Sequence, residues 1–474
     1  MSKDDKSNRD QIQFVCLEEL VPQNHLLRQV EAAIDFDFIY ELVADSYSHT
    51  GRPSIDPVVL VKIVMIQYLF GIRSMRQTIR DIEVNVAYRW FLGYNLYNEI
   101  PHFTTFGKNY KTRFAASDLF EQIFSRVLEE CIVRGLTEHS VLFLDSTHIK
   151  ASANRNKRIK VEARKQAQSY SKELRAEIAR DREENGKKPF DYDDDDDGSE
   201  AVTITQSTTD PDCGMFVKGE HERVFAYSAS TICDRHGYVL GYAVTAGNTH
   251  DSVSFEQIKE RIVELEGEIL VTDSAYKTPW IAKWLQQQQI TPNMPRTNPR
   301  TGKGFFRKYE YVYDEYYDCY LCPENQVLSY STTNRNGYRE YKSKSCICES
   351  CPSLKRCTAS KNHTKVITRH VWAEALEHME ESRYLSGMPE LYRLRKETIE
   401  RVFADAKEKH GLRYTNYRGL AKVRMQVGLT FACMNLKKLA RRLFASSSFG
   451  DFLGLCSSFL GFRFFKEDSS LAFA

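Results

Sequence analysis

Two short apolar runs in the middle of the chain constrain its fold more than any other feature. Each run leads directly to an aspartate: residues 140–144 precede Asp145, and residues 268–272 precede Asp273. Apolar runs of this length are typical of buried strands. Because strand ends at one edge of a sheet bring distant residues together, we expect the two aspartates to lie close to each other.

The segments around these two runs predict a mixed α/β core. Two β-rich runs, 224–233 and 238–244, are separated by Gly237 and indicate a hairpin. A helix is predicted over 254–266, and a further helix leads to a short strand at 290–294. The predicted order is therefore strand, hairpin, helix, strand, helix and strand.

Two long segments interrupt this predicted core. Residues 151–220 are strongly charged, and we expect an exposed helix over 156–181 followed by a disordered linker through 191–200, where six residues are Asp. Residues 297–385 are rich in Tyr and Cys and predict an irregular insertion. The first part of the core is thus expected to comprise 136–296.

Helices are predicted on both sides of the core. In the first helical region, 17–115, Asp56 and Pro57 mark the start of a run that is apolar nearly all round and indicates a buried helix. A long amphipathic helix is predicted over 389–410 and should end at Gly411. The remaining predicted segments are a polar N-terminus, 1–16, a C-terminal part of the core, 386–445, and a Phe-rich tail, 446–474.

The charge of the chain is unevenly distributed. The 474 residues suffice for two or three domains, and their net charge is only +2. Between Leu391 and Arg442, however, there are 14 Lys or Arg against 4 Asp or Glu, a local charge of +10 that is typical of a nucleic-acid-binding surface. The polar start has no apolar core like that of a signal peptide, and no apolar run reaches the roughly 18 residues of a membrane span, so we expect a cytoplasmic protein.

Three carboxylates are the candidate catalytic residues. Asp145 and Asp273 follow the predicted strands, and Glu400 lies about 100° around the helix from Ile399, at the edge of the apolar stripe. If this helix packs on the sheet, all three carboxylates reach one edge, where they repel one another unless a cation neutralises them. Such oxygen ligands suit Mg²⁺ or Mn²⁺, and two such ions activate a water or a 3′-hydroxyl for attack on a phosphodiester.

Spacing alone leaves alternatives to this set. Glu397 shares a helix face with Glu400 and is its rival. Asp251 and His250 are candidates for an auxiliary role. An Asp that follows a strand is also commonly a turn or helix-cap residue without catalytic function.

Six of the 12 cysteines lie within 319–357 and predict a structural zinc site. In chain order they are Cys319, Cys322, Cys346, Cys348, Cys351 and Cys357. The first and second, and the fourth and fifth, form two Cys-x-x-Cys pairs, and spacing alone favours these four as ligands. Four thiolates around Zn²⁺ would fold a small module that has little apolar core. The alternative is a set of reduced cysteines that bind no metal.

Three motifs resemble the catalytic blocks of DDE transposases from bacterial insertion sequences. In order, they are LFLDSTHIKA, LVTDSAYKT and ETIERVFADAKEKHGLRYTNYRG. The third is the most specific, because the family pattern has an apolar residue before a Glu, then an aromatic residue, and a Lys seven positions after the Glu. Ile399, Glu400, Phe403 and Lys407 match this pattern, so the resemblance selects Glu400 over Glu397.

The resemblance covers most of the chain. Residues 17–115 are similar to the N-terminal domain that accompanies such transposases, which implies a helical DNA-binding domain. Two departures concern fine DNA contacts: Ala275 stands before Tyr276 where the family commonly has Gly, and Lys396 stands where related enzymes often have Arg. The implied fold is an RNase H-like mixed sheet flanked by helices, with an all-helical N-terminal domain and a small Cys-rich insertion.

The resemblance implies a transposase that cleaves DNA and transfers strands at the ends of an insertion sequence. Its catalytic residues would be Asp145, Asp273, Glu400 and Lys407, and the three carboxylates would hold two Mg²⁺ or Mn²⁺ ions. The implied partners are double-stranded DNA, as terminal repeats and as target, and a second copy of the chain in a homodimer. No membrane is implied, and the site of action would be the bacterial cytoplasm, at the nucleoid.

The resemblance also favours one set of zinc ligands. Similar transposases carry Cys-Pro early and Cys-x-x-Cys-Pro late in this region. The favoured Zn²⁺ ligands are therefore Cys322, Cys348, Cys351 and Cys357, with Cys319 and Cys346 as alternates.

Basic and aromatic residues around and after the catalytic helix are the candidate DNA contacts. They are Lys396, Arg401, Lys409, Arg413, Tyr414, Tyr417 and Arg418. Such a surface neutralises phosphates and stacks on exposed bases. A solvated helical face is the ordinary alternative, and the local charge of +10 is high for it.

Two other functions remain open. A DNA-binding relic or regulator derived from a transposase would have lost catalysis, but the presence of all three carboxylates favours an active enzyme. A metal-dependent nuclease or phosphatase on the same core is disfavoured by Lys407 and by the N-terminal helices.

Overall fold

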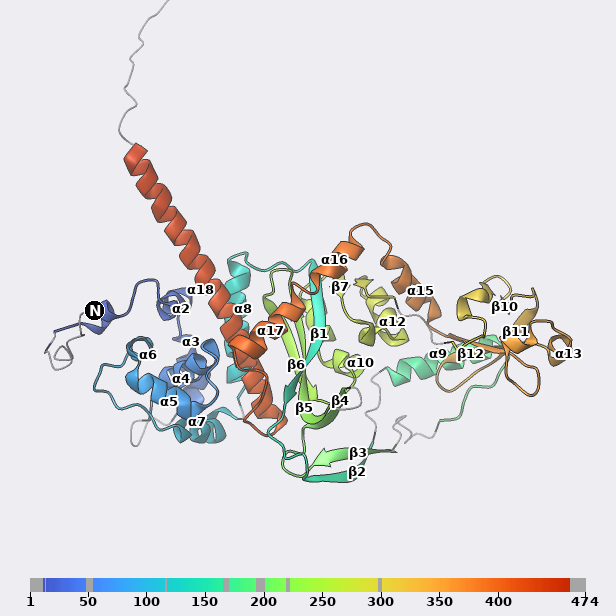
Figure 1. Cartoon of the computed structure of the whole chain (residues 1–474), viewed down its shortest axis with the longest axis horizontal. Helices are drawn as coiled ribbons and strands as arrows, with labels where there is room; N and C mark the ends of the chain where they lie inside the picture. The colour runs from blue at the N-terminus through green and yellow to red at the C-terminus, as the bar shows by residue number, and fades with distance from the viewer. Residues whose placement is uncertain are drawn as a thin grey trace, which may run out of the picture. The chain divides into compact units, whose positions relative to one another are not determined.

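The chain divides into two compact units. The computed structural model describes residues 12, 14–47, 54–115, 117–164, 170–192, 201–218, 222–296 and 301–460. The sheet unit comprises Glu138–Val402 and Tyr417–Leu420, and the helical unit comprises Met1–Thr137, Phe403–Asn416 and Ala421–Ala474. Helices and strands carry the labels of Figure 1.

The sheet unit is built on a mixed sheet whose central strands have the order of an RNase H-like fold. These strands are β1 (Val141–Lys150), β5 (Glu222–Cys233), β6 (Val239–Ala246), β7 (Ile269–Val271) and β8 (Thr291–Asn293). β6, β5 and β1 are antiparallel neighbours, and β7 and then β8 continue the sheet parallel to β1. The predicted fold class is confirmed, as are the hairpin, which is β5–β6, and the last strand, which is β8.

β1 is longer than the sequence predicts, because one neighbour, β5, continues beside it after the other neighbour, β7, has ended. On one side it pairs with β7 only over Val141–Phe143. On the other side it pairs with β5 from Phe143 to Lys150. Asp145 therefore lies inside β1, and the predicted strand end at this residue is wrong. It does lie two residues beyond the last residue that pairs with β7.

Short helices connect the strands of this sheet. They are α10 (Asp251–Ser254), η4 (Phe255–Gln257), α11 (Lys259–Glu264), η5 (Ser274–Tyr276) and α12 (Pro279–Gln287). The single helix predicted over 254–266 is wrong, because the backbone at Ile258, with φ −123°, leaves the helical region and divides the segment. α12 starts where the Thr278 hydroxyl accepts a hydrogen bond from the Ile281 amide.

The long helix predicted over 389–410 is two helices, α16 (Met388–Leu394) and α17 (Ile399–Lys409). Between them, the Leu394 carbonyl accepts hydrogen bonds from the Glu397 amide and from the Thr398 hydroxyl, both over 2.9 Å. Bonds to a carbonyl three residues back and from a Thr side chain tighten the chain into a turn. The prediction of one continuous helix is therefore wrong at residues 395–398.

The charged insertion after β1 is folded over most of its described length. It contains β2 (Arg158–Arg164), α9 (Ser171–Glu184), β3 (Ala201–Ser207) and β4 (Gly214–Lys218). The helix predicted over 156–181 is wrong in its first part, because β2 pairs antiparallel with β3 along its whole length. The predicted linker falls largely on residues 193–200, which lie outside the described residues.

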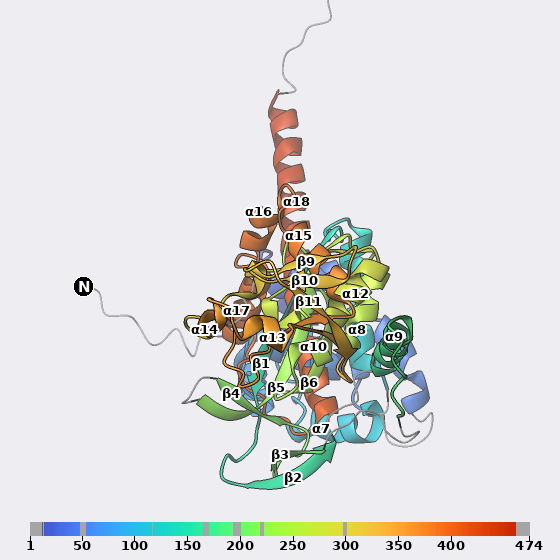
Figure 2. The same cartoon turned by 90° about the vertical axis from the view of Figure 1, so that its right-hand side faces the viewer.

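The segment 297–385, predicted to be irregular, contains a second sheet. Figure 2 shows three of its strands side by side. In the order β13-β12-β11-β10-β9, the antiparallel strands are β13 (Val366–His370), β12 (Tyr338–Lys342), β11 (Val327–Thr333), β10 (Cys319–Leu321) and β9 (Val312–Asp314). Its helices are η6 (Lys308–Glu310), α13 (Ser345–Cys348), α14 (Leu354–Cys357) and α15 (Ala373–Ser382).

This second sheet has an aromatic core of its own. The buried members are Phe306, Tyr311, Tyr320, Leu328, Tyr341 and Ile367. The prediction of irregular structure is wrong because tyrosines from separate segments bury their rings together. The module thus has an apolar core, although the sequence predicted little of one.

α9 supports the second sheet and is not the exposed helix that the sequence predicts. Figure 1 shows it beside β11 and β12. The buried carboxylate of Asp181 accepts hydrogen bonds from the Thr333 hydroxyl and the Arg339 guanidinium. Its neighbour Arg182 donates to the Thr333 carbonyl over 2.6 Å. A buried carboxylate with charged and polar partners ties the two insertions to each other.

The helical unit contains one helix that is buried on all sides, α4 (Pro57–Leu69). The others are α1 (Leu17–Leu20), α2 (Leu26–Ala33), α3 (Phe38–Val43), η2 (Ala44–Ser46), α5 (Met75–Val84), α6 (Val86–Phe91), α7 (Thr104–Asn109), η3 (Tyr110–Phe114), α8 (Leu119–Val133) and most of α18 (Leu420–Leu460). The predicted start of α4 is confirmed, since Asp56 accepts hydrogen bonds from the Val58 and Val59 amides.

The ends of the last two helices differ in how well they were predicted. α17 is followed by Gly411 with φ +73°, and the Leu412 amide donates to the Ala406 carbonyl, so the predicted helix stop is confirmed. Residues 446–460 of the predicted tail continue α18, and 461–474 lie outside the described residues. Within the part of the chain that the structure describes, no helix is long and apolar enough to span a membrane.

His410 is expected to make the helical unit sensitive to acid. Its ring is buried, and Nδ1 donates to the Tyr68 carbonyl over 2.7 Å. Burial lowers the pKa of His410 to about 4. Between pH 6.5 and 4, His410 is therefore protonated in the unfolded chain and neutral in the folded chain. The contribution of neutral His410 to the free energy of unfolding is therefore fully present above pH 6.5 and is lost as the pH falls from 6.5 towards 4. We expect the melting temperature to fall across this window, and to fall less in His410→Gln.

The matched control for this experiment is His378→Gln, because His378 is exposed. It should show the same decline as the parent. His370 in the sheet unit, whose pKa burial also lowers to about 4, contributes to the decline that remains in His410→Gln. An unchanged decline in His410→Gln would show that the acid sensitivity arises elsewhere.

Candidate active site

Asp145 and Asp273 occupy equivalent positions on neighbouring parallel strands. Phe143 of β1 is in register with Val271 of β7, and each aspartate lies two residues further on. The Asp273 carboxylate raises the pKa of Asp145, so the two groups are close enough to interact. The strand register therefore brings the two aspartates together, as the sequence indicates.

Each of these aspartates also holds the backbone amide that follows it. Asp145 Oδ1 accepts a hydrogen bond from the Ser146 amide over 2.8 Å. Asp273 Oδ1 accepts one from the Ser274 amide over 2.5 Å, at the start of η5. In each side chain, Oδ1 thus has the turn or cap role that the sequence left open. The other oxygen of Asp145, Oδ2, has a different partner.

Arg395 is that partner, and it links Asp145 to Glu400. It lies in the turn between α16 and α17, and its Nη2 donates to Asp145 Oδ2. Its Nη1 lies 3.9 Å from Glu400 Oε1. Arg395 is only 8% exposed, whereas the Glu400 side chain is 51% exposed. A buried guanidinium therefore joins two of the three predicted catalytic carboxylates.

The sequence analysis missed Arg395 because the periodicity predicts no turn here. In one continuous helix, Arg395 would lie about 140° around the axis from Glu400 and would not share its face. The break at residues 395–398 removes that separation. The Thr398 side chain that closes the turn was the only available signal, and Thr is too common in helices to predict a break.

The remaining acidic candidates differ in position. Glu397 lies in the turn and is exposed, while Glu400 lies in the first turn of α17 and has Arg395 near it. The geometry therefore favours Glu400. Asp251 begins α10, and its charge raises the pKa of Asp145, so it belongs to the same acidic environment. His250 accepts a hydrogen bond at Nδ1 from the Ser252 amide over 3.2 Å and caps α10.

Burial dominates the electrostatics of Asp145. It raises the pKa of Asp145 to about 6, against the lowering effects of the Arg395 charge and the Ser146 amide. The charges of Asp273 and Asp251 raise the pKa further. Burial and neighbouring negative charge both disfavour the ionised carboxylate, so positive charge beside Asp145 stabilises it. This cluster therefore favours the binding of positive charge.

A chain of buried hydroxyl groups joins the elements that carry the acidic residues. Ser146 Oγ lies 2.9 Å from both the Ser230 Oγ and the Tyr276 hydroxyl. Ser230 donates to Ser254 Oγ over 3.0 Å, and Ser254 donates to the Asp251 carbonyl over 2.9 Å. The chain connects β1, β5, η5 and α10, so it fixes the acidic segments relative to one another. Two of its members had a sequence signal, because Ser146 belongs to the first motif and Tyr276 to the second.

The chemistry of this cluster fits a divalent cation. Hard cations of this size prefer carboxylate oxygens, and Asp145 and Glu400 already share one positive charge, that of Arg395. In the described part of the chain, no group of three or more His, Cys, Asp or Glu side chains is arranged to hold a metal ion. The carboxylates thus suit a metal ion, but the cation that contacts them in this structure is the Arg395 guanidinium.

Four of the six candidate cysteines line one small cavity in the Cys-rich insertion. They are Cys322, Cys348, Cys351 and Cys357, the set that the resemblance favours. Cys319 lines a separate cavity, and Cys346 is exposed. The structure therefore groups the resemblance-based set more closely than the set favoured by spacing alone.

Two hydrogen bonds orient thiols of this cysteine group. The Gln326 amide donates to Cys322 Sγ over 3.3 Å, and the Tyr311 hydroxyl lies 3.2 Å from Cys357 Sγ. Burial raises the pKa of the Cys357 thiol, so a nearby cation is needed to stabilise its thiolate. Thiolates of this kind suit Zn²⁺. As at the acidic cluster, the described residues contain no three such side chains already arranged around a metal position.

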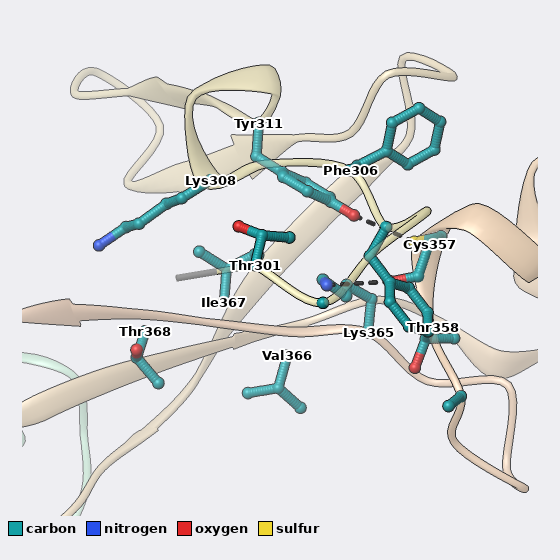
Figure 3. A pocket seen from close by; sticks show the side chains of 13 residues that line it. Thr301, Phe306, Lys308, Tyr311, Cys357, Thr358, Lys365, Val366, Ile367 and Thr368 are labelled. Carbon is teal, nitrogen blue, oxygen red and sulfur yellow. Dashed lines mark hydrogen bonds between the residues drawn. The ribbon is translucent and has the colours of Figure 1, made fainter. Parts of the chain in front are cut away.

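A larger cavity of about 450 Å³ shares Cys357 with this cysteine group (Figure 3). The Tyr311 hydroxyl points toward Cys357, and Lys365 Nζ donates to the Cys357 carbonyl over 2.9 Å. The backbone and side chain of Cys357 are thus both held. Phe306 and Lys365 also line both cavities, so the two lie next to each other.

Three of the predicted DNA contacts that lie in the sheet unit are accessible. Lys396 and Arg401 are exposed close to Glu400. Arg418 is also exposed and donates from Nε to the Ser152 carbonyl over 3.0 Å, while Tyr417 is half-buried. Lys396 and Arg401 therefore place exposed positive charge next to Glu400 in the chain.

The predicted contacts in the helical unit are partly neutralised by the chain's own acids. Lys409 pairs with Asp405 over 2.7 Å, and Arg413 pairs with Glu408. Tyr414 is 57% exposed. Lys407, on α17, is half-buried. Exposed ion pairs of this kind contribute little to stability, so the basic groups remain available to a stronger anion.

Two family models match the sequence. Residues 15–112 match a model described as Transposase domain (DUF772), and residues 321–440 match one described as Transposase DDE domain. The first covers the predicted N-terminal helical region, and the second includes the cysteine group, Arg395 and Glu400. A comparison with curated protein sequences gives no match.

Among solved structures, several transposase complexes show distant likeness to the chain. A piggyBac transposase synaptic complex with hairpin DNA has 10% identity and a TM-score of 0.37, with 90% of this chain and 80% of that chain covered. A Mos1 strand transfer complex has 9% identity, a TM-score of 0.16 and coverages of 77% and 81%. A Mos1 mariner paired end complex with Mn has 11% identity, a TM-score of 0.17 and coverages of 85% and 90%.

Tyr276→Phe is expected to weaken the buried hydroxyl chain. The change removes one partner of Ser146 and keeps the shape of the ring, so the free energy of unfolding should fall by about 1–2 kcal/mol. Chemical denaturation measures it. The control is Tyr316→Phe, whose ring is 87% exposed and whose loss of a hydroxyl should change stability by less than about 0.5 kcal/mol. Equal effects of the two changes would show that the chain of hydroxyl groups does not stabilise the fold.

Proposed function

We propose that this chain, which belongs to the DDE transposases, cleaves DNA and transfers strands at the ends of an insertion sequence with Asp145, Asp273 and Glu400 as its catalytic carboxylates. The observation that carries the proposal is the shared guanidinium: one buried cation pairs with Asp145 and lies near Glu400. Asp273 stands in the matching register position on the next strand. These contacts and this strand register support the assignment of the three carboxylates to one site.

The proposed metal ligands are these three carboxylates. Two Mg²⁺ or Mn²⁺ ions would supply a Lewis acid that activates a water or a 3′-hydroxyl and stabilises the leaving oxygen. The chain itself contributes fixed positions: the Ser146 amide holds Asp145, and the Ser274 amide holds Asp273. The hydroxyl chain through Tyr276 keeps their elements in place. Such preorganisation would keep the carboxylates in fixed positions when metal ions and DNA bind.

Lys407 and the basic residues around α17 are the proposed DNA contacts. Lys407 follows Glu400 by seven residues on the same helix, which corresponds to about two turns and to the same face. A Lys in this position would hold a phosphate of the strand being cut. Lys396, Arg401 and the other basic and aromatic candidates would extend this contact along double-stranded terminal repeats and target DNA.

The proposed assembly is a homodimer on DNA, acting in the bacterial cytoplasm at the nucleoid. The support is chemical: joining two element ends requires two sets of end-binding surfaces. No observation favours the alternative of a regulator that has lost catalysis, because all three carboxylates are present.

DNA cleavage tests this proposal directly. With Mg²⁺ and a DNA bearing candidate terminal repeats, we expect cleavage by the parent and a loss of at least about 100-fold in Asp145→Ala, Asp273→Ala and Glu400→Ala. Changes of outer-shell groups alone cost about 10–100-fold, and removal of a ligand should cost more. The rate of strand cleavage on labelled DNA is the measurement.

Glu397→Ala is the matched control, because Glu397 is an exposed glutamate three residues from Glu400. It should cut within about threefold of the parent, as expected for a surface change. If the three alanine variants cut as fast as the parent, the assignment of the catalytic residues is wrong.

The cysteine group is proposed to hold one structural Zn²⁺. We expect about one zinc per chain in the purified protein, and loss of that zinc in Cys322→Ser and Cys351→Ser, because each removes one of four thiolates. Elemental analysis by mass spectrometry measures it. Cys319→Ser, which changes a cysteine of the same insertion that lines a different cavity, should keep the zinc. A parent without zinc would refute the site.

A further inference from the structure

We infer that Arg395 is an internal counter-ion of the catalytic carboxylates, and that it must release Asp145 before a divalent ion binds there. Arg395 would then set the metal affinity of the protein when no DNA is bound. The inference rests on the proposed function, since it assumes that Asp145 and Glu400 are metal ligands.

The first argument is the position of the guanidinium. Its Nη2 donates to Asp145 Oδ2, and its Nη1 lies 3.9 Å from Glu400 Oε1. A metal ion bound by both carboxylates would need the same oxygen of Asp145 and the same space between the two groups. Two cations cannot share that space, because their repulsion in a partly buried site is strong. Arg395 and the metal therefore compete.

The second argument is the incomplete hydrogen bonding of Arg395. The residue is 8% exposed, yet its Nε is buried and has no hydrogen-bond partner. A guanidinium that serves only to hold a turn is expected to use its donors in paired, bidentate contacts. A buried donor without a partner costs free energy, so this arrangement is a poor final state for Arg395. Release of the Arg395 side chain should therefore cost little free energy once another cation neutralises Asp145.

The third argument is that the backbone around Arg395 is fixed while its side chain is long. On one side, the Met388 carbonyl at the start of α16 accepts a hydrogen bond from Asn293 Nδ2 over 2.8 Å. On the other side, Thr398 and Ile399 are buried. Release of Asp145 therefore requires only rotation about the side-chain bonds of Arg395, without movement of α16 or α17.

The surroundings of the pair add to this competition. The charges of Asp273 and Asp251 act on Asp145 together with that of Arg395. Burial raises the pKa of the nearby Tyr392, the charge of Arg395 and a hydrogen bond with it lower that pKa, and the charges of Asp273 and Asp145 raise it. The region therefore holds more negative than positive charge, so it attracts a divalent ion even while one guanidinium is present.

Metal titration of the full-length protein without DNA tests the inference. The probe is Mn²⁺, and isothermal titration calorimetry measures its Kd. If only one molecule in ten has Arg395 released, the apparent Kd is about tenfold weaker than the intrinsic value. We therefore expect Arg395→Gln to bind Mn²⁺ at least about tenfold more tightly than the parent. Arg395→Lys keeps a competing cation and should bind more weakly than Arg395→Gln.

Two further variants make the result specific. Arg393→Gln makes the same chemical change at an exposed residue two positions away and should bind Mn²⁺ as the parent does. Asp145→Asn combined with Arg395→Gln should abolish the gain in affinity, because the gain depends on that carboxylate. The thermal stability of Arg395→Gln should be lower than that of the parent without metal and should rise more on adding Mn²⁺, which also shows that the variant folds.

Equal or weaker Mn²⁺ binding by Arg395→Gln would overturn the inference and leave the proposed function intact, provided that the parent cuts DNA. Absence of Mn²⁺ binding in every variant, together with a parent that does not cut DNA, would refute the proposed function and the inference with it.

Discussion

The register between β1 and β7 is the constraint on which the acidic cluster depends. The two strands pair for only three residues, with Phe143 opposite Val271. Because they are parallel and in register, Asp145 and Asp273 leave the paired region at the same level. β5 continues alongside β1 to Lys150 and keeps Asp145 on a rigid strand. A shift of one residue in this register would turn one aspartate to the opposite face of the sheet.

The third carboxylate reaches this region through a break in a helix. α16 and α17 are separated by a turn that the Thr398 hydroxyl and the Leu394 carbonyl close. The turn buries Arg395 against Asp145 and leaves Glu400 exposed nearby. The cluster thus combines a carboxylate fixed on a strand with one on a more accessible helix. Such an arrangement suits chemistry on a large substrate, which must approach from the exposed side.

The two insertions are more ordered, and more closely joined to each other, than the composition suggests. The charged segment after β1 supplies α9, whose buried Asp181 is bonded to Thr333 and Arg339 of the second sheet. That sheet has its own aromatic core, and Cys322 and Cys357 of the cysteine group pack against it. A zinc ion would therefore stabilise a module that already packs apolar side chains.

The sequence by itself determined the order of the core elements, because the apolar runs that form β1, β5, β6, β7 and β8 are buried whatever surrounds them. It also indicated Asp145 and Asp273, and by resemblance Glu400 and the four cysteines. Only the tertiary structure decided that Arg395 joins Asp145 to Glu400, that α9 is partly buried and that the tyrosines form a second core. These features depend on contacts between residues far apart in the chain, 250 positions for Arg395 and Asp145, and local periodicity carries no information about such pairs.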